Sequence, residues 1–82
     1  MPAVPSNDNK VELFPNPASN TFTIVSSGQI FSVVISNPLG QLLYSSQFSV
    51  GMRQTKIDVS ALPSGVYFVK VNGAEVRKLL KE

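Results

Sequence analysis

The chain has 82 residues, a formal net charge of +2 at pH 7, and neither cysteine nor histidine. These absences exclude disulfides, Ser-His-Asp and Cys-His nucleophile pairs, and metal sites built from imidazole or thiolate. So small a net charge does not indicate a nucleic-acid-binding surface. We therefore expect one small domain that is not an enzyme, uses no cofactor and binds no nucleic acid.

Residues 1–10 are rich in proline, asparagine and small side chains, and they show no periodicity. This composition predicts a linker that precedes a folded domain at residues 11–82. The linker lacks the apolar stretch of a signal peptide, and no run reaches the ~18 apolar residues of a membrane span. We therefore expect a domain that does not span the membrane and whose location depends on the protein to which it is attached.

Apolar, β-rich runs follow the linker at regular intervals, as in folds built from short antiparallel strands. The predicted strands cover residues 11–14, 21–25, 31–36, 42–46, 54–59, 66–71 and 75–80. A helix over residues 74–81 is the alternative for the last run, but it would be short and would lack an N-cap. The spacing therefore predicts an all-β fold.

Proline, glycine and asparagine lie between these runs. Pro15, Asn16 and Pro17 impose turn or extended geometry. Gly40 supplies the positive-φ position of a four-residue hairpin loop. The Asn72-Gly73 pair suits a type I′ turn, so the last two strands should pair antiparallel.

Leu62, Gly65 and Tyr67 lie at the entry of the predicted strand 66–71. Their spacing resembles the tyrosine corner of immunoglobulin-like domains, in which the tyrosine hydroxyl bonds a backbone group a few residues upstream. Together with the strand spacing, this corner predicts an immunoglobulin-like Greek-key β-sandwich of about seven antiparallel strands.

Alternation of apolar and polar residues assigns the faces of several strands. The groups predicted to share a face are Phe22 with Ile24, Phe31 with Val33 and Ile35, Ile57 with Val59, and Tyr67 with Val69 and Val71. Strand 66–71 is apolar on its other face as well, at Val66 and Phe68. Either a loop partly covers this strand, or Val66 or Phe68 belongs to a patch that meets a partner.

Four motifs occur in order along the chain. They are Phe14-Pro15-Asn16-Pro17-Ala18, Gly40-Gln41-Leu42-Leu43-Tyr44, the block from Leu62 to Val71, and Arg77-Lys78-Leu79-Leu80-Lys81. Together they make residues 11–82 resemble the type A C-terminal sorting domain of type IX (Por) secretion system substrates. The resemblance implies a domain that directs its passenger protein from the periplasm, with shuttle proteins, through the outer-membrane translocon. It also implies that a sortase-like cysteine peptidase cuts before Val11, leaving the passenger at the outer-membrane surface or outside the cell.

The resemblance places translocon recognition on the last strand, at Arg77, Lys78, Leu79, Leu80 and Lys81. Both faces of this strand carry charge and bulk, which is typical of an edge strand. An edge leaves backbone donors and acceptors to which a partner strand, or a second copy of the domain, can add. Alternatively, the Lys and Arg side chains only protect the edge from aggregation.

The motif residues outside the last strand are interpreted as structural: Pro15, Asn16, Pro17, Gly40, Leu62, Gly65 and Tyr67. Two other functions are compatible with the predicted fold. One is an immunoglobulin-like carbohydrate- or protein-binding adhesion module, and the other is a structural spacer. A sugar platform needs exposed aromatic rings, whereas most of the two Tyr and five Phe are expected in the core.

Overall fold

Five β-strands make up the fold of residues 10–82, the part of the chain that the computed structural model describes. They are β1 (Val11–Phe14), β2 (Thr21–Ser36), β3 (Leu42–Asp58), β4 (Gly65–Val71) and β5 (Glu75–Lys81). The sheet order is β1-β2-β4-β5, with β3 also paired to β2, and all these pairings are antiparallel. The all-β class is confirmed, and the predicted strand at residues 75–80 is β5. No helix within residues 10–82 is suited to cross a membrane.

Two long strands replace four of the predicted short ones. β2 contains both 21–25 and 31–36, and β3 runs from 42–46 through most of 54–59. At the bend of β2, the Ser26 hydroxyl accepts a hydrogen bond from Gly28 N (3.1 Å). The β2–β3 pairing continues beyond this point with shifts of register. Small, turn-forming residues thus produce bulges and curvature instead of a chain reversal.

The number of strands differs from the prediction for this reason. Five strands are found in place of about seven, and the immunoglobulin-like sandwich is not confirmed. The predicted linker falls mostly on residues 1–9, which lie outside the described residues. Lys10 already extends the β1–β2 pairing, because its carbonyl accepts from Ser27 N (3.0 Å) and its amide donates to the Ser27 hydroxyl (2.9 Å).

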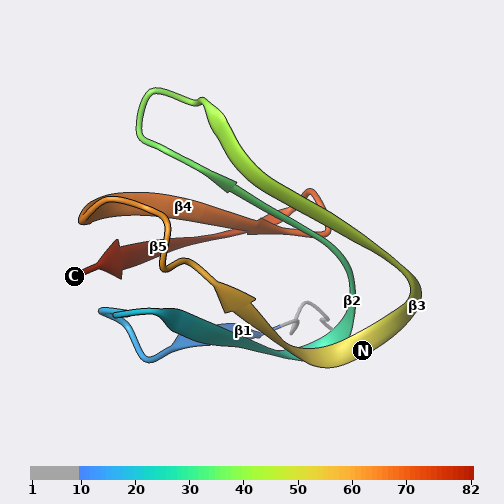
Figure 1. Cartoon of the computed structure of the whole chain (residues 1–82). Helices are drawn as coiled ribbons and strands as arrows, with labels where there is room; N and C mark the ends of the chain where they lie inside the picture. Colours follow the sequence, from blue (N-terminus) through green and yellow to red (C-terminus); the bar gives the residue numbers. More distant parts are fainter. Residues whose placement is uncertain (1–9) are drawn as a thin grey trace, which may run out of the picture.

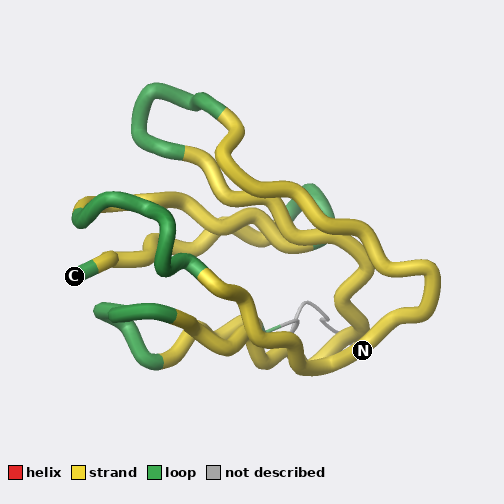
Figure 2. The backbone as a smooth tube through the Cα atoms, viewed as in Figure 1, coloured by secondary structure: helices red, strands yellow, loops and turns green. Residues whose placement is uncertain are grey.

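The curvature of β2 and β3 rolls the sheet around its core. β1 pairs with the first half of β2, whereas β4 pairs with the second half (Figure 1). Figure 2 shows the long β2–β3 hairpin curving over, so that strand segments of the two halves lie across from one another. Side chains from both halves fill the space between them, and the largest fully buried ones include Phe22, Ile24, Ile35, Ile57 and Leu79.

The predicted faces are confirmed for most strands. Phe22 with Ile24, Ile57 with Val59, and Tyr67 with Val69 and Val71 are all buried. The exception is Phe31, which is 46% exposed although Val33 and Ile35 are fully buried. A register shift between Ile30 and Ser32 puts Ile30 into the core and turns Phe31 outward.

Two predicted turns are present. Gly40 has a φ of +88°, and its amide donates to Asn37 O (2.9 Å) in the β2–β3 loop. Asn72 and Gly73 have φ values of +56° and +70°, as a type I′ turn requires, and Ala74 N donates to Val71 O (3.1 Å). This turn joins β4 to β5, which pair antiparallel as predicted.

The tyrosine-corner hydrogen bond is also present. Tyr67 is 6% exposed, and its hydroxyl donates to the carbonyl oxygen of Pro63, four residues upstream. Leu62 packs against the core beside it, and Gly65 has a φ of +155°. This bond fixes the chain at the entry of β4 and satisfies a phenol group that would otherwise be costly to bury.

Candidate functional site

Strands β4 and β5 present one face to solvent. Three cross-strand pairs make up this β4–β5 outer face: Val66 with Leu80, Phe68 with Lys78, and Lys70 with Val76. Val76 is 46% exposed, Leu80 38% and Val66 37%. Directly opposed side chains on one sheet face contact each other, so apolar and basic groups form one continuous surface. Such a surface suits a partner that offers apolar groups together with carboxylates.

The five residues predicted to form the recognition element do not share this face. Lys78 and Leu80 belong to it and are exposed. Leu79 is fully buried in the core. Arg77 and Lys81 point the other way and are half-buried. The structure thus divides the predicted element into two outward side chains, one core residue and two flanking cations.

The outer face also includes three residues of β4. They are Val66, Phe68 and Lys70, which lie opposite residues of β5. Sequence reasoning had identified the apolar second face of this strand and left two explanations for it. The structure shows Val66 and Phe68 on the outer face of the sheet, where Val66 is 37% exposed and Phe68 is half-buried. Lys70 and Val76 share the faces of their strand neighbours by alternation, and the pairing that sets them opposite each other depends on the register of the β4–β5 hairpin.

Residues 16–18 cover the outer edge of β5. The Asn16 side chain donates through Nδ2 to Lys78 O (2.9 Å) and accepts through Oδ1 from Leu80 N (2.9 Å). Ala18 continues the pattern with its backbone, donating to Leu80 O (2.7 Å) and accepting from Glu82 N (2.8 Å). The expectation of free backbone groups along this edge is therefore wrong at these positions. The side-chain amide of Asn16 and the backbone of Ala18 thus make the hydrogen bonds that a neighbouring strand would otherwise make.

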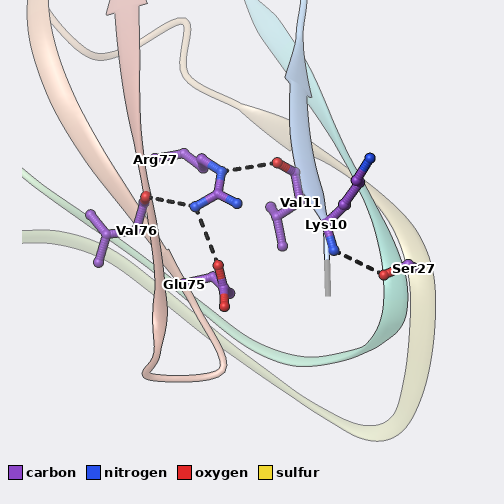
Figure 3. A network of polar contacts seen from close by, with 6 residues as sticks. All are labelled: Lys10, Val11, Ser27, Glu75, Val76 and Arg77. Carbon is purple, nitrogen blue, oxygen red and sulfur yellow. Dashed lines mark hydrogen bonds and ion pairs between the residues drawn. The ribbon is translucent and has the colours of Figure 1, made fainter. Parts of the chain in front are cut away.

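Arg77 connects the start of the domain to β5 (Figure 3). Its Nε donates to Val11 O (3.0 Å), and its Nη1 donates to Val76 O (3.0 Å) and lies 3.3 Å from Glu75 Oε1. The ion pair is more than one-third exposed, so it adds little stability by itself. The geometric result is that the peptide entering β1 is held beside the first half of β5.

A recess of about 230 Å³ lies next to this contact, between Val11, the bend of β2 and the β4–β5 turn. This volume is smaller than the roughly 300–1,000 Å³ of small-molecule sites. Within residues 10–82, no three His, Cys, Asp or Glu side chains are grouped so that they could hold a metal ion. The exposed surface of β4 and β5, and not the recess, is thus the candidate functional site.

Comparison with known protein families gave a match over nearly the whole chain. A family model described as a secretion system C-terminal sorting domain matches residues 12–82. No curated protein and no solved structure matches the chain. The family match spans all four motifs noted in the sequence and confirms the resemblance that they carry.

Proposed function

Because the chain belongs to the family of secretion system C-terminal sorting domains, which are sorting signals of type IX secretion, we propose that the translocon machinery binds its β4–β5 outer face. This family is not an enzyme family, and it indicates export toward the outer membrane or the extracellular space. In our proposal the folded domain carries its passenger across the periplasm to the outer-membrane translocon and its shuttle proteins.

The observation that carries the proposal is the outward position of Lys78 and Leu80 on a strand whose edge is already covered. Asn16 and Ala18 already form hydrogen bonds with backbone groups of Lys78, Leu80 and Glu82. A partner strand could add there only by displacing these bonds. Side-chain contacts with the outer face need no such displacement, so they are the simpler route to recognition of the folded domain.

Removal by a sortase-like cysteine peptidase and attachment of the passenger to the cell surface complete the proposal. The cut would lie before Val11, in a segment that includes Lys10. Support for this position comes from Arg77, which holds the entering peptide beside β5. Translocon machinery bound to β4 and β5 would then lie close to the peptide that is cut.

A reporter fusion tests the sorting role. A periplasmic reporter is joined to residues 1–82 in a type IX-competent host and in the same host without its translocon. We expect surface reporter only in the first host, together with a released fragment that begins before Val11 by mass spectrometry. Reporter retained in the periplasm of the competent host would refute sorting. Surface reporter that keeps the domain attached would refute removal alone.

The structure also improves the choice of variants. Deleting residues 78–82 would remove Leu79, which is fully buried, and would therefore disturb the core along with the outer face. Substitution of Lys78 changes the face and leaves Leu79 in place. A loss of export by such a variant reports on recognition and not on folding.

The adhesion module remains the alternative function. Phe14 and Phe31 are 48% and 46% exposed but lie on different strands. The Phe31 ring lies against Gly51 on β3. A glycan array with the isolated domain distinguishes the two functions, since saturable sugar binding is expected only of the adhesion module.

A further inference from the structure

One long strand edge has no covering segment among residues 10–82. β3 pairs with β2 along one side only, and no other described strand pairs with it. The edge of β5, by contrast, is covered by Asn16 and Ala18. The open end of the sheet within the described residues is thus β3.

The backbone groups that face outward on β3 follow from the pairing of β2. Asn72 bonds both the amide (3.1 Å) and the carbonyl (2.9 Å) of Ser32, so these groups point toward β4. Backbone groups of successive residues point to opposite sides of a strand. Val33 and Ile35 therefore bond their partners in β3, Ser46 and Tyr44. The amides and carbonyls of the alternate residues 45 and 47 are left facing away from the sheet, whereas the register shift beside Ile35 interrupts the alternation at Leu43.

Within residues 42–52 this edge lacks two features that usually prevent pairing between molecules, charge and proline, and its regular pairing with β2 runs over residues 44–47 between two bulges. Edge strands are commonly protected by charged side chains or proline. Residues 42–52 contain neither, and the first charge on β3 is that of Arg53. Leu42 and Val50 are 63% and 75% exposed along the same stretch.

We propose that β3 binds the β3 strand of a second copy of this chain, antiparallel and centred at Ser45. In that register Ser45 pairs with Ser45 of the copy, so outward-facing backbone groups meet outward-facing backbone groups as an antiparallel ladder requires. Tyr44 meets Ser46 of the copy, and residues 42–48 contain no charged side chain that would oppose its own copy. The segment is complementary to itself, which favours a second copy over a charged peptide.

The pairing would also extend the core. Tyr44 and Phe48 are half-buried and pack at its rim. Across a two-fold axis each subunit would cover these side chains of the other. Such an interface joins two sheets into one and leaves the β4–β5 outer face exposed, so it is independent of the proposed sorting role.

Sedimentation velocity of residues 1–82 over a range of concentrations tests the proposal. We expect a monomer–dimer equilibrium that Ser45→Pro weakens roughly tenfold or more in dissociation constant, because proline removes one outward amide. Ser45→Ala is the matched control and should dimerise like the unmodified chain. A chain that stays monomeric at every concentration, or a dimer that Ser45→Pro leaves unchanged, would overturn the proposal.

A charge pair tests the register and the identity of the occupant without proline. Ser45→Lys and Ser45→Glu each place like charges opposite each other in the homodimer, so both proteins should be monomeric when alone. Their mixture should form a heterodimer. Failure of the mixture to associate, with both variants folded by circular dichroism, would contradict self-pairing at Ser45.

Discussion

Two asparagine side chains make hydrogen bonds that a strand backbone would otherwise make. Asn16 bonds Lys78 O and Leu80 N at the edge of β5. Asn72 accepts from Phe31 N (2.7 Å) and Ser32 N (3.1 Å) and donates to Gln29 O (2.8 Å) at the bulge of β2. Asn72 lies in a turn as predicted and Asn16 lies at a bend, but the long-range bonds of both were not predictable from local sequence.

Replacing Asn16 tests the cover over β5. Asn16→Ala removes two hydrogen bonds, and we expect it to lower the free energy of unfolding by about 1–2 kcal/mol in urea denaturation. The Leu80 amide should also exchange faster with solvent. Asn20→Ala is the control, because the Asn20 side chain makes no hydrogen bond within residues 10–82. Equal stability and exchange in the two variants would contradict the assigned contact.

Replacing Asn72 separates backbone from side-chain effects. Asn72→Ala loses the bonds to β2 and also puts alanine at a φ of +56°, so we expect a loss of about 2–3 kcal/mol. Asn72→Gly loses the same bonds without the backbone strain and should cost about 1 kcal/mol less. Thermal unfolding of both variants measures the difference. An Asn72→Gly variant as stable as the unmodified chain would show that the bonds to β2 contribute nothing.

The pKa of the Asp58 carboxyl reports on its hydrogen bonds with Ser60. Its carboxylate accepts a hydrogen bond from Ser60 N (2.8 Å), which, with the Ser60 hydroxyl, lowers the pKa of Asp58 below 3.8. A lowered folded-state pKa stabilises the fold above the unfolded-state pKa, and this stabilisation is lost as the pH falls through the folded value. Carboxyl titration by NMR should give a midpoint below 3.8 that rises in Ser60→Ala. A midpoint at or above 3.8 would refute the effect.

At the scale of elements, the bend of β2 and β3 decides the architecture. Turn-forming residues 26–28 predict a chain reversal, yet they lie within one strand because their polar groups are satisfied there by Gly28 and Lys10. Sequence alone does not distinguish a turn from a bulge, since glycine and serine serve both. The faces of most strands were predictable, because alternation is local.

Gly51 is the element-scale position that sequence reasoning missed. A Cβ there would come within 2.8 Å of Cζ of Phe31 and 2.8 Å of Cβ of Gln29. We expect Gly51→Ala to destabilise the domain by about 1–3 kcal/mol in urea denaturation, with Ser49→Ala on the same strand as the neutral control. The cost should fall by about 0.5 kcal/mol or more in a Phe31→Ala background. Strict additivity of the two substitutions would contradict the close contact.

Hairpin register explains why the candidate site was only partly predictable. A two-residue Asn72-Gly73 loop would pair Val71 directly with Ala74. Instead, Ala74 belongs to the turn and Val71 pairs with Glu75. A change of one residue moves every side chain of a strand relative to its neighbour. The residues of the last strand were thus identifiable, but their partners on β4 were not.

At the scale of the whole molecule, the curled sheet brings the start and end of the domain together. Arg77 bonds Val11, and Asn16 and Ala18 bond β5. These contacts join residues separated by more than 60 positions in the chain. Strand β5, the residues that cover its edge and the start of β1 therefore form one unit, with the outer face of β4 and β5 exposed beside it.

Surface display of a reporter fused to residues 1–82 tests this account most directly when two charge reversals are compared. Lys78 lies on the β4–β5 outer face, whereas Lys56 is an equally charged, exposed residue on β3. Lys78→Glu should reduce surface reporter by roughly tenfold, the effect of losing about 1.4 kcal/mol of binding, and Lys56→Glu should leave it unchanged. Equal export of the two variants, with both domains folded, would contradict recognition through this face.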